Sequence, residues 1–263
     1  MSALERITPV SGAPCWVSLA ARDLRTAQSF YAAVMHWEFR DSSLGSGFSV
    51  ALAHGSPVAG IGRCPGGDGP AAVWIPYFAV SSADGTADRV RERGATLAVG
   101  PIPLGDGRAG VAADREGATF GFWEGPTPAW SVGEGAPARL DLQTRHALEA
   151  AIFYAEVFDW APGPSGGCTV DYAQDHVLVQ VGGRTVATLR GGAIDADPDP
   201  SARTRWIVDF FVPDSEQSAA AAVAHGGEAI RVFSPGGSSE SRSSETAFVI
   251  CDPEGALFSV SDR

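Results

Sequence analysis

The chain has 263 residues, 44% of them hydrophobic, which is enough for one large domain or two domains of ordinary size. Its 19 basic and 31 acidic residues give a net charge of -12, which argues against a nucleic-acid phosphate backbone as a partner. No run reaches the 18 or more apolar residues of a membrane span, and no signal-peptide pattern opens the chain, so we expect a cytoplasmic protein that does not contact a membrane.

The side chains present exclude several kinds of chemistry. Every basic residue is an arginine, because the sequence contains no lysine, and this removes Schiff-base chemistry and a P-loop phosphate site. The cysteines lie far apart in the sequence without a CxxC pair, which argues against a zinc site and against a disulfide framework. They are Cys15, Cys64, Cys168 and Cys251.

The first 125 residues alternate between strand and helix patterns. An alternating segment, WVSLAAR at 16–22, predicts a strand, and DLRTAQSFYAAVM spaces its apolar residues as one face of a helix, with Asp23 as N-cap. Short strands with Gly-rich turns follow, and the pattern then restarts. The restart comprises a strand at 74–80, a helix at about 84–93 that ends at Gly94, and strands through Phe122.

The same pattern returns in the second half of the chain. FYAAVMHW at 30–37 matches FYAEVFDW at 153–160 with an offset of 123 residues, and WIPYFAV at 74–80 matches WIVDFFV at 206–212 with an offset of 132. VAADREGATFGFW at 111–123 matches VICDPEGALFSVS at 249–261 with an offset of 138. Three matches in the same order indicate an internal repeat, which we call copy one and copy two.

The repeat predicts a module at 12–125, a Gly- and Pro-rich linker at 126–137 and a second module at 138–263. Each copy has the pattern βαβββ-βαβββ. Because the Rossmann glycine signature is absent and the strands after each helix form hairpin-like series, we expect an α+β fold of curved mixed sheets and not a doubly wound parallel sheet. The segments 194–203 and 236–245 are predicted surface loops.

The helix signature DLRTAQSFYAAVMHW and the closing turns DREG and DPEG resemble the vicinal-oxygen-chelate superfamily, which includes glyoxalases, bleomycin-resistance proteins and dioxygenases. The tandem arrangement resembles the glyoxalase-like group of actinobacterial type. The resemblance implies a cup-shaped sheet in each module. It does not imply one activity, because this scaffold hosts isomerases, ring-cleaving dioxygenases, thiol transferases and drug-sequestering proteins.

The resemblance also implies where a metal ion would be bound. Metal-dependent members use His, Glu or Gln on the first strand, His on the restarted strand and Glu on the last strand. The matching positions here offer no imidazole, carboxylate or thiolate, so we predict no metal cofactor. In copy one, these positions are Trp16, a position near Ile75, and Gly121. In copy two, they are Arg139, a position near Ile207, and Ser259.

Strand alternation then predicts what lines each cup, because side chains two residues apart share a face. The copy-one lining is aromatic, and Trp74 and Trp206 lie at the rim or pack outward. Aromatic walls with a few polar groups suit a flat organic ligand, whereas the alternative is that these rings only fill the core. The predicted ligand-binding residues are Trp16, Ser18, Trp74, Tyr77, Trp123, Trp206 and Ser259.

Copy two offers charged side chains instead. Arg139, Asp141 and Asp209 converge if the face assignment holds. One interpretation is a salt-bridge network that fixes the fold. The other is a catalytic site in which an aspartate is the general acid-base residue and the arginine stabilises an oxyanion.

These patterns favour a metal-independent protein that binds or sequesters a planar aromatic natural product, such as an anthracycline-like polyketide, in antibiotic resistance or as an accessory to biosynthesis. The net negative charge would favour a ligand with an ammonium group. The alternative is a cofactor-independent isomerase, cyclase or hydroxylase partner, and a metal-dependent glyoxalase or dioxygenase is the third hypothesis. The expected assembly is a monomer or a homodimer.

Overall fold

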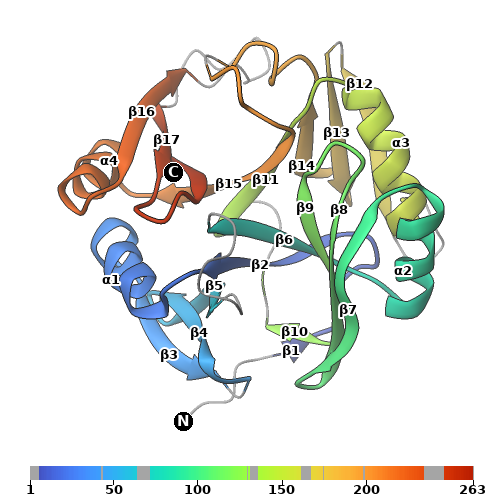
Figure 1. Ribbon diagram of the computed structural model, residues 1–263, viewed down its shortest axis with the longest axis horizontal. Coiled ribbons are helices and arrows are strands. Elements are labelled where there is room, and N and C mark those ends of the chain that lie inside the picture. Colours follow the sequence, from blue (N-terminus) through green and yellow to red (C-terminus); the bar gives the residue numbers. More distant parts are fainter. Residues whose placement is uncertain are drawn as a thin grey trace. The chain divides into compact units, whose positions relative to one another are not determined.

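The structure is a computed structural model, and it describes residues 6–42, 44–63, 72–128, 130, 136–160, 167–173, 175–197, 199–233 and 246–262. Cys64 and the predicted loop at 236–245 lie outside the described residues. Four helices are present in the described part of the chain, two in each copy, as the repeat predicted (Figure 1). They are α1 (Leu24–Met35), α2 (Ala83–Glu92), α3 (Ala147–Phe158) and α4 (Ser215–Ala224).

Copy one forms a mixed eight-stranded sheet in the order β3-β4-β5-β2-β6-β9-β8-β7. The pairs β2 with β5 and β6 with β9 are parallel, and the hairpins on either side are antiparallel. The strands are β2 (Pro14–Ala21), β3 (Glu38–Ser42), β4 (Gly45–Ala53), β5 (Ser56–Arg63), β6 (Val73–Ala79), β7 (Thr96–Leu104), β8 (Gly107–Ala113) and β9 (Thr119–Glu124).

Copy two forms a second eight-stranded sheet with the equivalent order, β12-β13-β14-β11-β15-β18-β17-β16. The predicted α+β fold of two tandem modules with mixed sheets is therefore confirmed. The strands are β11 (Ala138–Gln143), β12 (Cys168–Ala173), β13 (His176–Val181), β14 (Arg184–Arg190), β15 (Arg205–Val212), β16 (Glu228–Phe233), β17 (Thr246–Cys251) and β18 (Leu257–Asp262).

The predicted linker contains a short element of its own. Its residues Thr127–Pro128 (β10) pair antiparallel with Arg6–Ile7 (β1), close to the beginning of the chain. This two-stranded sheet was not predicted, because a strand of two residues leaves no alternation for a sequence pattern to show.

Side chains cap three of the four helices. Asp23 accepts a hydrogen bond from the backbone N–H of Thr26 at 2.8 Å, which confirms it as the N-cap of α1. Asp214 caps α4 in the same way through Gln217, and Ser82 caps α2 through Gly85. His146 occupies the N-cap position of α3 and makes no side-chain cap bond. It instead lies near Glu116, as described below.

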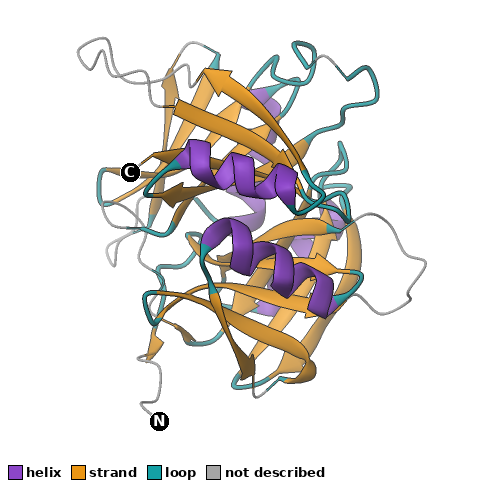
Figure 2. Cartoon of the chain, turned by 90° about the vertical axis from the view of Figure 1, so that its left-hand side faces the viewer, coloured by secondary structure: helices purple, strands orange, loops and turns teal. Residues whose placement is uncertain are grey.

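The chain folds into two compact units, and each takes residues from both copies. Unit 1 comprises residues 1–17 and 75–207, so α2 and α3 pack together in it. Unit 2 comprises residues 18–74 and 208–263, and in it α1 packs beside α4, as Figure 2 also shows. The sheets thus follow the repeat, whereas the hydrophobic cores combine one half of each copy.

Candidate functional site

Strand alternation in unit 1 gives β6 and β9 two different faces. Phe78 is fully buried against Phe158 of α3, with ring centroids 4.5 Å apart, whereas Tyr77 is partly exposed on the opposite face. Tyr77 pairs in register with Gly121, and Trp123 lies two residues further along β9, so the three share a side of the sheet. We call this surface the aromatic face. Trp16 on β2 has the same partial exposure.

The ring of Tyr77 lies across Gly121. A Cβ atom on Gly121 would be only 2.4 Å from this ring, so the ring occupies the space that any side chain at position 121 would need. Burial raises the pKa of Tyr77 to about 12, and the Cys15 thiol adds to the shift, so the phenol stays neutral at physiological pH. Tyr77 can therefore offer a ring and a hydroxyl hydrogen-bond donor together.

Trp123 is held in place at the end of β9. Its indole N–H donates to the backbone carbonyl oxygen of Pro126 at 3.2 Å, and its ring covers Gly107, where a Cβ atom would lie 2.5 Å from the ring. Ser18, which lies in unit 2, is 8% exposed. The aromatic face is thus built from rings that lie over glycines of neighbouring strands.

The equivalent surface of copy two in unit 1 carries charges. On β11, Arg139, Asp141 and Gln143 alternate with buried Leu140 and Leu142. The Nε–H of Arg190, on the neighbouring strand β14, donates to Asp141 at 2.6 Å. We call this surface the charged face, defined by Arg139, Asp141, Gln143 and Arg190, with Arg205 at the start of β15. Arg205 donates to Gln143 at 3.0 Å and to Asp197.

Asp209 lies in unit 2 and is only 5% exposed. Its two carboxylate oxygens accept hydrogen bonds from the hydroxyls of Ser259, at 2.8 Å, and Ser261, at 3.0 Å. Tyr77, Gly121 and Trp123 occupy the equivalent positions in copy one by the offsets of the repeat. The same strand positions therefore hold a carboxylate with two hydroxyls in one copy and rings over glycine in the other.

Trp74 and Trp206 lie on the other face of their strands. The indole N–H of Trp74 donates to the hydroxyl of Tyr31, which donates to the carboxylate of Asp252. Trp206 is bonded in the same way to Tyr154, whose hydroxyl donates to Asp114. Both tryptophans are buried, at 1% and 4% exposure. The sequence left open whether they lie at the rim of the cup or pack outward, and the structure shows that they pack outward.

The two aspartates belong to the closing turns of the repeat. Asp252 accepts hydrogen bonds from the backbone N–H groups of Glu254 and Ala256, and Asp114 makes the equivalent bonds in unit 1. Burial raises the pKa of Asp252 and Asp114 above the ordinary value, although these hydrogen bonds oppose the shift. The DREG and DPEG motifs therefore have a structural role.

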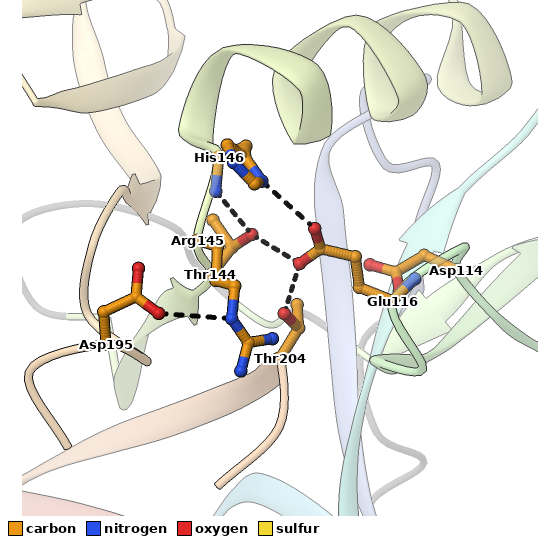
Figure 3. Close-up of polar contacts among 7 residues, drawn as sticks. All are labelled: Asp114, Glu116, Thr144, Arg145, His146, Asp195 and Thr204. Carbon is orange, nitrogen blue, oxygen red and sulfur yellow. Dashed lines mark hydrogen bonds and ion pairs between the residues drawn. The ribbon is translucent and has the colours of Figure 1, made fainter.

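The glutamate of each turn binds the segment that precedes a helix. In unit 2, Glu254 accepts from the backbone N–H groups of Arg22 and Asp23, both at 2.8 Å. In unit 1, Glu116 accepts from the hydroxyls of Thr144, at 3.0 Å, and Thr204, and lies near His146 (Figure 3). Burial alone would raise the pKa of Glu116, but the hydrogen bonds hold it below the ordinary value.

A small cavity of about 150 Å³ lies beside this cluster. Acidic side chains and the first turns of α3 line it, and its lining includes none of the residues that define the aromatic and charged faces. The lining residues are Asp114, Arg115, Glu116, Thr144, Glu149, Ala150 and Phe153.

Metal-dependent members of the vicinal-oxygen-chelate superfamily bind a metal ion at a small set of strand positions. In this chain, the residues at those positions do not suit a metal ion. Tyr77 covers position 121, and the hydroxyl of Ser259 is bonded to Asp209. Within the described residues, no three His, Cys, Asp or Glu side chains form a group that could hold a metal ion. Cys15 and Cys168 are buried, and burial raises the pKa of both thiols, so neither suits thiolate chemistry.

Comparison with known proteins places the chain in a family. Residues 139–261 match the model of the glyoxalase-like domain. CFP32 of Mycobacterium tuberculosis, which carries a provisional glyoxylase name, is 30% identical over 258 residues, covering 95% of this chain and 94% of that protein. The anthracycline biosynthesis protein DauV of Streptomyces sp. (strain C5) is 30% identical over 273 residues, covering 95% and 92%. The chain is a tandem glyoxalase-like member of the vicinal-oxygen-chelate superfamily.

Solved structures of this superfamily share the fold. A Mn(II)-bound glyoxalase from Novosphingobium aromaticivorans aligns with a TM-score of 0.57 and 14% identity, covering 96% of this chain and 82% of that one. A catechol 2,3-dioxygenase aligns with a TM-score of 0.55 and 12% identity, covering 97% and 94%. In the described part of the chain, no helix is long and apolar enough to span a membrane.

Sequence reasoning missed several residues of the charged face. Arg190 and Gln143 were not singled out, although β14 ends with Arg190 on the side of Asp141. Arg205 was missed because it precedes the repeated WIVDFFV segment. The alternation of β14 shows which side Arg190 takes, but its partner follows only from the parallel pairing of β11 and β14, which no local pattern encodes.

Proposed function

We propose that this protein binds a planar aromatic natural product of the anthracycline type, without a metal ion, as an accessory to its biosynthesis or in resistance to it. The observation that carries the proposal is the ring of Tyr77, fixed across Gly121, with Trp123 on the same face. Rings held against backbone are pre-organised, so a flat ligand can stack on them without ordering flexible side chains.

Two further observations support this ligand class. Relatives that align over almost the whole chain are named as anthracycline biosynthesis proteins, DauV and DnrV. The net charge of -12 would attract a ligand that carries an ammonium group, such as an aminosugar, and a tryptophan ring can add a cation–π contact. The names of these relatives favour the biosynthetic role over resistance.

The test is calorimetric titration of metal-stripped protein with an anthracycline and with its aglycone, followed in parallel by tryptophan fluorescence. We expect saturable binding that weakens about tenfold or more in Tyr77→Ala and in Trp123→Ala. Tyr172→Ala is the matched control, because Tyr172 is 59% exposed on the edge strand β12. Absence of binding, a requirement for added metal, or equal losses in the control would refute the proposal.

A second candidate function is a cofactor-independent enzyme that acts on a similar metabolite, and the buried carboxylate of Asp209 favours it. Two serine hydroxyls hold this carboxylate in one orientation, as a general base requires. Asp141, beside Arg190, is the other candidate for this role, and Arg139 lies on the same face as a group that could stabilise an oxyanion. Turnover of a bound ligand should be measured for the native chain and for each of the variants Asp209→Asn and Asp141→Asn. Loss of turnover with retained binding would establish an enzyme.

A further inference from the structure

On the charged face, the guanidinium groups of Arg190 and Arg205 are held by hydrogen bonds that occupy only some of their N–H donors. The Nε–H of Arg190 is bonded to Asp141, and Arg205 is bonded through Nε to Gln143 and through Nη2 to Asp197. A guanidinium has five N–H donors in a planar fork. Among the described residues, the Nη groups of Arg190 and Nη1 of Arg205 donate no further hydrogen bond.

The two arginines lie close together in unit 1. Arg190 pairs in register with Gln143, the residue whose side chain accepts from Arg205, so Gln143 stands between them. The side chains of Arg190 and Arg205 are 33% and 27% exposed. They are therefore held by neighbours and still reachable from solvent.

The fold itself does not need these arginines. Gln143 corresponds to Ala20 in copy one, and the residue paired with Ala20 is Gly62. Arg205 directly precedes the repeated segment WIVDFFV, and the offset of 132 residues for that segment makes Val73 its counterpart in copy one. Copy one thus builds the same strands without either guanidinium, which separates their role from that of the fold.

We propose that the charged face is a binding site for the carboxylate of a small organic acid, distinct from the aromatic face. A carboxylate is planar and accepts two parallel N–H groups from one guanidinium, which matches the open edge of Arg190. An aspartate already lies beside each arginine, so a phosphate dianion would meet repulsion that a single carboxylate largely avoids.

The experiment uses the full chain with Tyr77→Ala and Trp123→Ala, so that the aromatic face is disabled. Calorimetry compares 2-naphthoate with 2-naphthamide, which has the same rings and no charge. We expect one equivalent of naphthoate to bind at least tenfold more tightly than the amide, and inorganic phosphate not to displace it. Arg190→Gln should remove this preference, and Arg184→Gln, an exposed arginine on the same strand β14, should leave it unchanged.

Arg190→Gln also removes the hydrogen bond from Arg190 to Asp141. The double variant Arg190→Gln with Asp141→Asn and the variant Arg190→Lys are therefore measured beside it. We expect the double variant to lose the preference while remaining folded, and Arg190→Lys to retain only part of it. Equal binding of acid and amide, or a preference that survives Arg190→Gln, would overturn the inference. These results are independent of the anthracycline titration, so the site and the proposed function can fail separately.

Discussion

A tyrosine hydroxyl connects three segments in each unit. In unit 2, Tyr31 on α1 accepts from Trp74 at 3.0 Å and donates to Asp252 at 3.0 Å, and Tyr154 has the same role in unit 1. Both tyrosines are fully buried among other rings. At this depth a lost hydroxyl cannot be replaced by bulk water.

Tyr31→Phe should therefore lower the free energy of unfolding by about 2–4 kcal/mol, because it leaves the buried indole N–H of Trp74 and an oxygen of Asp252 without this partner. Urea unfolding measures the change. Tyr172→Phe, on the exposed side chain of β12, should change stability by about 0.5 kcal/mol or less. Equal effects of the two substitutions would contradict this assignment.

The raised pKa of Asp252 predicts a pH dependence of stability. Between the ordinary value of 3.8 and the raised value, the folded chain binds more protons than the unfolded chain, so this group's contribution to stability falls as pH rises. Asp252→Asn removes the titration. The loss of stability that it causes should be larger at pH 4 than at pH 7 when both are measured by urea unfolding. Asp88→Asn, on the exposed surface of α2, is the control and should have little effect on stability at either pH. A loss of stability in Asp252→Asn that grows with pH would contradict the predicted direction of the pH dependence.

At the scale of single elements, the pairing of β6 with β9 places the ring of Tyr77 over Gly121 on the aromatic face. Gly121→Ala places a Cβ atom 2.4 Å from the ring of Tyr77, so the ring must move. We expect anthracycline affinity to fall about tenfold, measured by calorimetry. Gly47→Ala on β4 is the control, because no atom of the described residues lies within 4 Å of its Cβ position. Unchanged affinity in Gly121→Ala would mean that Tyr77 is not part of the binding surface.

The elements themselves were largely predictable from the sequence. The N-cap Asp23 and the apolar spacing that follows it locate α1. Alternation put Tyr77 and Asp141 among the residues expected to line the cups, and in the structure both are partly exposed. Their partners were not predictable. The pairing of Asp141 with Arg190 joins residues 49 positions apart, and that of Asp209 with Ser259 joins residues 50 apart. Such contacts depend on strand register, which local patterns do not encode.

At the scale of the whole chain, the repeat predicts modules, whereas the compact units combine halves of both copies. The reason lies in the helices: α1 packs with α4, and α2 packs with α3, so each core needs a helix from each copy. Sequence self-similarity reveals which segments are equivalent. It does not predict which of two equivalent helices a given helix packs against.

This interleaving predicts that neither copy folds alone. Residues 1–125 and 138–263, expressed separately, should each lack a complete core and show poor amide protection and non-cooperative unfolding, because each unit draws on both. Mixed or co-expressed, they should form a stable complex with the cooperative unfolding of the intact chain. Calorimetry and hydrogen exchange provide the measurement. A cooperative transition for either fragment alone would contradict the prediction.

The shared cores also restrict how a duplicated gene of this kind can change over time. After duplication one copy is usually free to drift, but here a substitution on a helix of either copy alters a core that the other copy also uses. Drift is tolerated on the sheet surfaces that face away from the helices. There the copies have indeed parted, with rings over glycine in one and arginine beside aspartate in the other. The architecture thus lets two different sheet surfaces evolve while both ancestral halves still contribute to each core.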